Sequence, residues 1–290
     1  MWNPFNRNTI SNSSASKRSL QLITQKDMPF AYVEAYKALR TNLSFLSGSG
    51  DVHAFVVTST VPEEAKSNVS VNLALALTES GKKVVLVDCD LRKPVLHRYL
   101  KAGHNLKGVS NVLSRQVALS DALVKLKDIP NLTFLPAGTT PPNPSELLSQ
   151  PQMQEMVDTL RGSYDFVILD APPISMVTDA AVIGRIVDGA LFVVRSKYAS
   201  TDAVKTALEK LQDAGVKVLG AVLTRYDAKK SLKRSDYGYG YYYYNSNYSY
   251  GTPPHRTSES EAKKSSITAK KSIPHIRRMK HDRPSLPYPS

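Results

Sequence analysis

The sequence holds a single cysteine, Cys89, among 290 residues, so no disulfide can form within the chain. This usage is typical of proteins that stay in a reducing, cytoplasmic compartment. The chain also lacks any run of about 18 uninterrupted apolar residues, and residues 1–26 have no apolar core of signal-peptide length. We therefore expect a cytoplasmic chain that does not cross a membrane by itself.

Acidic residues are scarce at the two ends of the chain, so the formal net charge of +13 is unevenly spread. Residues 1–30 carry four basic and one acidic side chain, a net +3, and residues 229–290 carry thirteen basic and four acidic, a net +9, which leaves +1 for residues 31–228. Basic ends can contact anionic lipid, nucleic acid or an acidic partner, but solvated tails are the simpler interpretation. We expect no nucleic-acid partner.

Strand-type and helix-type patterns alternate through residues 30–228. Short apolar runs predict strands at 54–59, 84–87, 132–135, 166–169, 190–194 and 216–223. Apolar spacings of three and four predict helices at 31–46, 66–80, 109–113, 119–126, 145–148, 151–160 and 201–214. The alternation indicates an α/β fold with a doubly wound, mostly parallel sheet flanked by helices.

The loop after the first predicted strand has the spacing of a phosphate-binding loop. In the pattern G-x-x-x-x-G-K-[ST], Thr60 and Ala65 occupy the glycine positions and Lys66 and Ser67 end the loop. Backbone N–H groups of such a loop surround phosphates, the lysine reaches the β- and γ-phosphates and the hydroxyl binds Mg²⁺. If position 65 requires a positive φ, its alanine costs roughly 1 kcal/mol.

Acidic side chains end two further predicted strands. Asp88 and Asp90 lie two positions apart and share a side of the chain, and Asp170 ends the strand at 166–169. One carboxylate can orient Mg²⁺ while another receives a proton from an attacking hydroxyl. A helix cap or a turn residue is the alternative role for any one of them, but the three with the lysine-serine pair together indicate one nucleotide site.

With these motifs the sequence resembles the bacterial tyrosine kinases, P-loop autokinases that regulate capsular and exopolysaccharide synthesis. The resemblance covers about residues 20–250 and rests on segments 34–43, 60–68, 88–94, 136–138, 142–148 and 165–170 and on a terminal tyrosine cluster. It implies a P-loop NTPase fold. It also implies transfer of the γ-phosphoryl group of ATP, with Mg²⁺, to the tyrosine tail of a neighbouring subunit in a ring.

The resemblance assigns roles to single residues. The implied catalytic residues are Lys66, Asp88 and Arg92, with Asp88 assisting removal of the tyrosine proton. The implied metal ligands are Ser67, Asp90 and Asp170. The implied nucleotide-binding residues are Thr60, Pro62, Glu64, Ala65, Lys66, Ser67, Asn68 and Thr224.

The sequence departs from the family pattern inside the loop and at the base. Glu63 and Ala65 replace loop glycines, and Glu63 and Glu64 add negative charge near a site for phosphates. Thr224 stands where the family usually has an asparagine that contacts adenine.

The helix predicted at 31–46 carries a pattern that the family uses to form rings. Glu34, Lys37 and Arg40 match E-x-x-R-x-x-R, with lysine replacing the first arginine and losing its bidentate fork. A solvated face with ion pairs inside the helix is the alternative.

The segment 237–250 holds eight of the fifteen tyrosines of the chain. We expect the phosphorylation sites to be Tyr237, Tyr239, Tyr241, Tyr242, Tyr243, Tyr244, Tyr248 and Tyr250. A low-complexity adhesive tail or a base-stacking surface for single-stranded nucleic acid is the alternative.

The expected organisation has four parts. They are a polar arm at 1–29, a P-loop kinase domain at 30–228 with its oligomerisation helix at 31–46, a tyrosine-rich substrate tail at 229–251 and a basic disordered tail at 252–290. The resemblance implies a transmembrane polysaccharide chain-length regulator as activator, a phosphotyrosine phosphatase as a further partner, and a location at the inner face of the plasma membrane through the membrane partner.

Two other functions remain open from sequence. One is a partitioning-type P-loop ATPase switch, although that group carries an additional lysine five residues before the main one, where this chain has Val61. The other is a catalytically weak regulatory homologue, which Glu63 and Ala65 favour.

Overall fold

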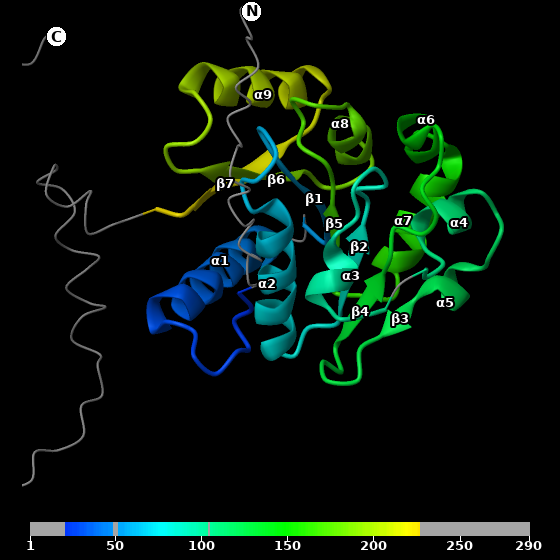
Figure 1. The fold of residues 1–290 in the computed structure, drawn as a ribbon, viewed down its shortest axis with the longest axis horizontal. Coiled ribbons are helices and arrows are strands. Elements are labelled where there is room, and N and C mark those ends of the chain that lie inside the picture. Colours follow the sequence, from blue (N-terminus) through cyan, green and yellow to red (C-terminus); the bar gives the residue numbers. More distant parts are fainter. Residues whose placement is uncertain (1–20, 49–51, 104, 227–290) are drawn as a thin grey trace, which may run out of the picture. The chain divides into compact units, whose positions relative to one another are not determined.

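The computed structural model describes residues 21–48, 52–103 and 105–226, which form a seven-stranded sheet with helices on both faces (Figure 1). The strands lie in the order β3-β4-β2-β5-β1-β6-β7. Every neighbouring pair is parallel except β3 and β4, which are antiparallel. The bounds are β1 Ala54–Ser59, β2 Val84–Asp88, β3 Val124–Lys125, β4 Leu132–Leu135, β5 Phe166–Asp170, β6 Ala190–Arg195 and β7 Val218–Thr224. The predicted α/β class is confirmed.

The helices fall into two groups that bury opposite faces of the sheet (Figure 1). One face packs against α1 (Phe30–Gly48), α2 (Lys66–Glu79) and α3 (Leu96–Tyr99). The other packs against α4 (Val109–Leu113), α5 (Leu119–Ala122), α6 (Pro144–Leu148), α7 (Pro151–Arg161), α8 (Asp179–Gly184) and α9 (Thr201–Asp213).

The strand sequences follow from burial on both faces. In β1, Phe55 and Val57 belong to the core beneath α1 and α2, whereas Ala54 and Val56 belong to the core on the opposite side. Because neither face meets water, a central strand reads as a continuous apolar run rather than an alternating one. This is why the short apolar runs locate the central strands within a residue of their observed bounds.

The helix predicted at 119–126 is wrong in its second half. The helix ends at Ala122, and Val124 and Lys125 form β3 instead, pairing with Phe134 and Thr133 of β4. Pairing with a neighbouring strand is a tertiary contact that local apolar spacing does not report. Helices α3 and α8, of four and six residues, were not predicted.

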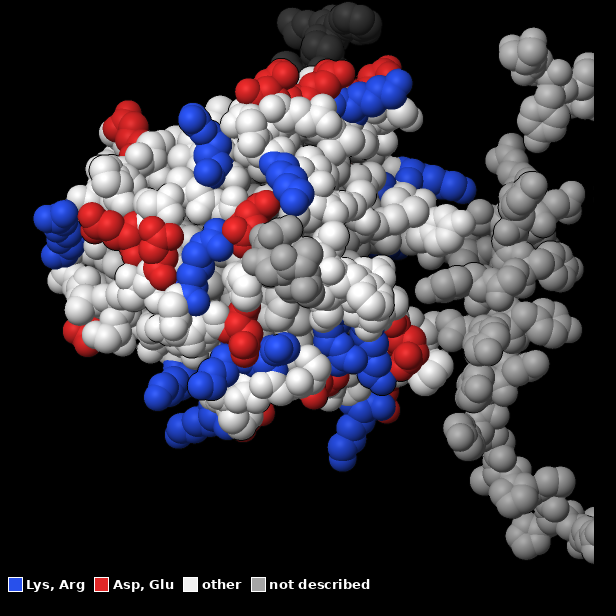
Figure 2. Space-filling model, turned by 180° about the vertical axis from the view of Figure 1, so that it is seen from behind, with Lys and Arg blue, Asp and Glu red and all other residues white. Residues whose placement is uncertain are grey.

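No helix in the described part of the chain has both the length and the apolar content that a bilayer crossing requires. On the face shown in Figure 2, acidic side chains lie among the basic ones. This distribution agrees with the near balance of charge counted in residues 31–228.

Asp188 joins three parts of the fold through one carboxylate. Its Oδ2 accepts hydrogen bonds from the backbone N–H groups of His53 (2.7 Å) and Ala54 (2.8 Å) at the start of β1, and Nη1 of Arg161, at the end of α7, donates to both carboxylate oxygens. Partial burial acts to raise the pKa of Asp188, but these donors outweigh it and the pKa lies below its ordinary value. The folded state therefore favours the charged form of this carboxyl group.

We expect Asp188→Asn to lower the free energy of unfolding by about 1–3 kcal/mol at pH 7, because a partly buried charged acceptor is lost. Since the folded pKa is depressed, the contribution is fully present above the unfolded pKa near 4 and disappears as the pH falls through the folded value. Urea unfolding at pH 7 and near pH 3 measures this. The difference in the free energy of unfolding between the parent and Asp188→Asn should be smaller near pH 3 than at pH 7. The exposed control Asp213→Asn should differ little from the parent at either pH. A difference that is unchanged in acid would contradict the role of charge.

Candidate active site

Three parallel strands bring the predicted phosphate and metal residues to one edge of the sheet. Strand β5 lies between β2 and β1, and Asp88 at the end of β2 is in register with Asp170 at the end of β5. Strand β1 ends at Ser59, and residues 60–65 lead from it directly into α2, which begins at Lys66. The carboxyl ends of adjacent parallel strands are the usual place for a ligand in an α/β sheet.

Lys66 lies between two carboxylates. Its Nζ is 3.1 Å from Oδ2 of Asp170 and 3.3 Å from Oδ2 of Asp90, and it lies 3.1 Å from Oγ of Ser67. The side chain of Lys66 is only 11% exposed, so these charges interact with little screening by water. The convergence expected from sequence, a lysine and a hydroxyl facing acidic strand ends, is present in the structure.

Two serines of α2 hold the fully buried carboxylate of Asp170. Ser67 Oγ donates to Oδ2 at 2.6 Å and Ser70 Oγ donates to Oδ1 at 2.8 Å. Ser70 was not singled out from sequence, although its position three residues after Ser67 places both on one side of the helix. Together the serines fix the orientation of Asp170 toward Lys66.

The surroundings of Asp88 raise its proton affinity. Burial raises the pKa of Asp88 to about 8, and the nearby Asp170 adds to the rise. Burial acts to lower the pKa of Lys66, but the charges of Asp170 and Asp90 outweigh it and the pKa is raised. A further positive charge beside Asp88 would favour its ionised form, which is the form that can accept a proton.

The loop has positive φ at two non-glycine residues. Glu63 has φ 68° and Ala65, the N-cap of α2, has φ 72° and ψ 23°. Both lie in the left-handed region, where a Cβ atom is unfavourable and glycine is the usual residue. The positive φ that the phosphate-loop pattern requires at position 65 is thus adopted despite the alanine.

We expect Ala65→Gly to raise the free energy of unfolding by up to about 1 kcal/mol, because removing the Cβ relieves the left-handed conformation. The same substitution in a right-handed backbone, Ala35→Gly on the exposed side of α1, should lower it by about 0.5–1 kcal/mol. Urea unfolding of the parent and the two variants measures the difference. If both variants lost stability equally, position 65 would not be strained.

Glu64 turns its charge away from the mouth of the loop. Its side chain is buried, Oε2 accepts from the N–H of Val61 at 2.9 Å and Oε1 accepts from the N–H of Arg195 at 3.1 Å. The hydroxyl of Thr224, at the end of β7, donates to the backbone carbonyl of Glu64 at 2.9 Å. Glu64 and Thr224 therefore tie the loop to β6 and β7, and direct contact of Thr224 with a base stays a prediction.

The residues present fit a Mg²⁺-bound nucleoside triphosphate. No group of three His, Cys, Asp or Glu side chains in the described residues forms a ready-made metal cage. Mg²⁺ does not need one, because it keeps several waters and takes one or two carboxylates together with phosphate oxygens. Ser67, Asp90 and Asp170 would supply the ligands that come from the protein. Thr60 Oγ1 is buried without a hydrogen-bond partner among the described residues, an unmet polar group at the base of the loop.

Comparison with known proteins places the chain in a family. Residues 64–218 match the family described as AAA domain. The tyrosine-protein kinase YwqD of Bacillus subtilis (strain 168) is 37% identical over 205 residues, which are 71% of this chain and 84% of the relative. The chain belongs to the bacterial tyrosine kinase family.

Solved structures agree with this membership of the tyrosine kinase family. The crystal structure of the chimerical protein CapA2B2 aligns with a TM-score of 0.64 and 35% identity over 69% of this chain and 86% of that one. The septum site-determining protein MinD of Pyrococcus horikoshii OT3, complexed with Mg-ADP, aligns with a TM-score of 0.53 and 24% identity over 64% of this chain and 78% of that one. The second similarity shows a shared P-loop NTPase fold.

In this tyrosine kinase family member, the hydrogen bonds of Arg92 go to Asp179 and Ser145 rather than to the strand-end carboxylates. Its Nε and Nη2 donate to the fully buried carboxylate of Asp179 at 3.0 and 3.1 Å, and Nη2 also donates to Ser145 Oγ at 2.8 Å. The hydrogen bonding to Asp179 raises the pKa of Arg92. Its catalytic role stays a prediction, and its two partners were not singled out from sequence.

The side chain of Asn68 faces helix α1 rather than the loop. Its Oδ1 accepts from the hydroxyls of Tyr32 (2.9 Å) and Tyr36 (3.2 Å), and its Nδ2 donates to the carbonyl of Gln21. Any contact of Asn68 with a nucleotide would therefore use its backbone N–H. Pro62, the remaining residue predicted to bind nucleotide, is exposed at the tip of the loop.

The three residues of the predicted ring-forming pattern have partners within the chain. Lys37 Nζ is 2.7 Å from Oε1 of Glu34, the ion pair inside the helix that was the alternative interpretation. Arg40 Nη1 donates to the carbonyl of Ala76 in α2 at 2.9 Å. These contacts do not test a subunit interface.

The predicted phosphorylation sites at 237–250 and the basic tail at 252–290 lie outside the described residues.

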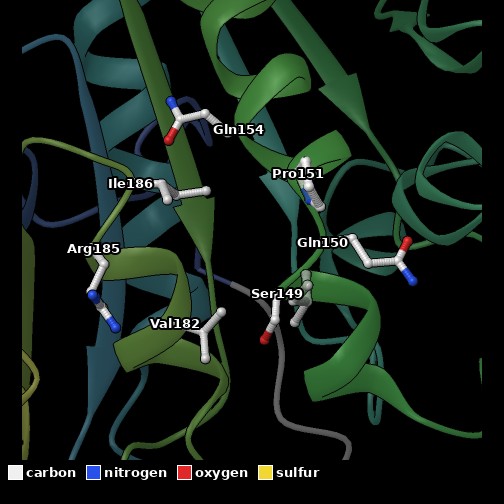
Figure 3. A pocket seen from close by; sticks show the side chains of 8 residues that line it. Ser149, Gln150, Pro151, Gln154, Val182, Arg185 and Ile186 are labelled. Atoms are coloured by element: carbon white, nitrogen blue, oxygen red, sulfur yellow. The ribbon is translucent and has the colours of Figure 1, made fainter.

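A hollow of about 400 Å³ lies elsewhere, between the α6–α7 junction and α8 (Figure 3). Its lining includes Leu148, Pro151, Val182 and Ile186, and none of the predicted site residues contributes to it. The hollow is therefore distinct from the nucleotide site.

Proposed function

We propose that this family member is an ATP- and Mg²⁺-dependent protein-tyrosine autokinase. The observation that carries the proposal is the convergence of Lys66 and Ser67 with the strand-end carboxylates Asp90 and Asp170, beside Asp88. Such a site can bind a triphosphate and still leave one carboxylate free to receive a proton. A relative at 37% identity carries the name tyrosine-protein kinase.

The proposed transfer assigns one role to each side chain. Lys66 holds the β- and γ-phosphates, while Ser67, Asp90 and Asp170 hold the metal, whose charge offsets that of the phosphates. The phenol oxygen of a tyrosine attacks the γ-phosphorus as the bond to ADP breaks. Asp88 takes the phenol proton, so phosphotyrosine and ADP leave with all atoms accounted for.

We further propose the tyrosines of 237–250 as acceptors on a neighbouring subunit, in a ring formed through α1. Regulation of capsular or exopolysaccharide synthesis, activation by a transmembrane chain-length regulator, reversal by a phosphotyrosine phosphatase and a position at the inner membrane face belong to the same proposal. The resemblance to the family and the tyrosine-rich sequence support them.

Chain length alone does not decide between transfer within a subunit and transfer between subunits. Tyr237 follows Tyr226 by eleven residues, an extended reach of about 37 Å, whereas β7 lies four strand positions from β2, roughly 19 Å. A mixing experiment is therefore required.

We expect a full-length Lys66→Met chain to become phosphorylated when mixed with a full-length chain whose eight tail tyrosines are phenylalanine, because one supplies acceptors and the other the intact site. Anti-phosphotyrosine detection after incubation with Mg-ATP measures this, with one chain tagged to separate the two by size. Each chain alone should stay unlabelled. Labelling of the parent but not of the mixture would contradict transfer between subunits.

The partitioning-type ATPase remains the alternative because MinD shares the fold, but Val61 stands where that group has its additional lysine. ATP hydrolysis without phosphotyrosine, in the presence of the cytoplasmic segment of a chain-length regulator, would favour the alternative. Nucleotide binding with neither ATP hydrolysis nor phosphotyrosine formation would favour a catalytically weak homologue.

A further inference from the structure

A second hollow, of about 220 Å³, lies beside the residues that follow the catalytic strand end. Arg92 lines it from the segment after β2, two residues beyond Asp90, and the remaining lining comes from Pro142, Asn143, Pro144, Ser145 and Glu146. The motif at 142–148 was part of the family resemblance, yet none of its residues has a role in the proposed phosphoryl transfer. The hollow gives this motif a place next to the site.

Arg92 is held rigidly at the wall of this hollow. Asp179, whose side chain is fully buried, accepts from two of its nitrogens, and Ser145 accepts from one of them while donating to Asp179 at 2.5 Å. The third nitrogen, Nη1, has no hydrogen-bond partner in the described residues, and the side chain of Arg92 remains 36% exposed. A planar cation fixed in this way can pack against an aromatic ring or donate to a phenol oxygen.

The charges around the hollow favour a neutral occupant. The charge of Arg92 is matched by Asp179, so the exposed Glu146 leaves the surroundings with one net negative charge. Asn143 Nδ2 donates to Glu146 Oε2 at 2.8 Å and keeps that carboxylate in the lining. A phosphate group carries about −1.5 to −2 charge and would be repelled, whereas an uncharged ring can pack against the two prolines.

We propose that this hollow binds a tyrosine side chain of the segment 237–250 that neighbours the tyrosine undergoing phosphorylation. The inference rests on the proposed kinase function and adds a determinant of its substrate. In Tyr237-Gly-Tyr239-Gly-Tyr241, side chains two positions apart point the same way along an extended chain, about 6.8 Å apart. One ring can then occupy the hollow while its neighbour reacts.

Docking of a neighbouring tyrosine affects the order of modification. A neighbouring tyrosine that is already phosphorylated binds poorly in the hollow, because Glu146 repels its phosphate and the charge of Arg92 is already matched by Asp179. Each transfer therefore weakens the docking of the adjacent tyrosine, and modification of the segment slows as it proceeds.

The test uses peptides of the segment 234–240 and a full chain whose eight tyrosines at 237–250 are alanine, so that the chain's own copy of the segment does not compete with the peptide. In one set Tyr239 is the acceptor and position 237 is tyrosine, phenylalanine, alanine or phosphotyrosine; in the second set the two positions are exchanged. Phosphorylation at each position is followed by mass spectrometry at saturating Mg-ATP. The pocket variant carries Pro142→Ala and Asn143→Ala, both at exposed positions, and the matched control Gln154→Ala alters the hollow of Figure 3.

We expect the KM of the alanine-flanked peptide to exceed that of the phenylalanine-flanked peptide by about threefold to tenfold in at least one set, since the ring contact is lost. The KM of the phosphotyrosine-flanked peptide should be at least as high, and Glu146→Gln should lower it. The pocket variant should remove the preference without changing the KM for ATP, and Gln154→Ala should retain it.

Equal KM values for the phenylalanine- and alanine-flanked peptides would overturn the subsite alone, as would a preference that persists in the pocket variant. Tighter binding of the phosphotyrosine-flanked peptide would overturn it in favour of an anion site. Absence of phosphotyrosine with every peptide would instead overturn the proposed kinase function.

Discussion

Lys66→Met should reduce phosphotyrosine formation by at least about 10²- to 10³-fold, the scale seen when one charged contact to a developing charge is removed. The methionine keeps the length of the side chain but lacks the ammonium group that lies 3.1 and 3.3 Å from Asp170 and Asp90. Anti-phosphotyrosine detection with Mg-ATP measures the loss. Retention of parental activity would show that another cation holds the phosphates.

The same variant should also lose stability in a chelating buffer. Lys66 pairs with Asp90 and Asp170, so its removal leaves buried like charges uncompensated, at a cost of about 3–5 kcal/mol. Thermal unfolding of the parent, Lys66→Met and the exposed control Lys82→Met measures this. Loss of activity with no change in the unfolding temperature would indicate that the carboxylates are neutral in the resting protein.

Asp88→Asn should have the opposite effect on stability while abolishing transfer. The amide has the shape of the carboxyl group but cannot accept the phenol proton, so we expect phosphotyrosine formation to fall by about 10²- to 10⁴-fold. Because burial and the nearby Asp170 raise the pKa of Asp88 to about 8, its charge is present mainly above that pH, and there its removal relieves a repulsion. In a chelating buffer the variant should unfold at the temperature of the parent or above it.

Nucleotide affinity separates the two variants further. Lys66→Met should weaken ATP binding measured by calorimetry, whereas Asp88→Asn should leave it within a few-fold of the parent, since Asp88 acts on the acceptor. The exposed substitution Asp128→Asn serves as a control that should change neither activity nor affinity. Full activity in Asp88→Asn would exclude this residue as the base.

The central strands and the convergence at their ends were predictable because they depend on short-range patterns. An apolar run that ends in aspartate identifies both a strand covered on two faces and the position of a polar side chain at its end. A parallel sheet brings Asp88 and Asp170 to the same edge, and the strand order, which was not predicted, makes them neighbours.

The remaining contacts could not be predicted because they join segments far apart in the chain. The bond between Arg92 and Asp179 spans 87 residues and that between Glu64 and Arg195 spans 131. Neither residue pair has a spacing that sequence can show. The two loop glutamates appeared alike in sequence, yet Glu64 is buried with its charge turned away from the loop mouth, whereas Glu63 is exposed.

The edge formed by β7 affects how the purified protein should be handled. Strand β7 ends the sheet with seven residues, whereas the opposite edge, β3, has two. Among the described residues no strand pairs with the outer side of β7, which leaves backbone donors and acceptors there for an approaching strand, and Leu223 of β7 is 51% exposed. Concentrated stocks are therefore most prone to precipitate through pairing along β7, and a lysine at position 223 is a suitable solubilising change for crystallisation.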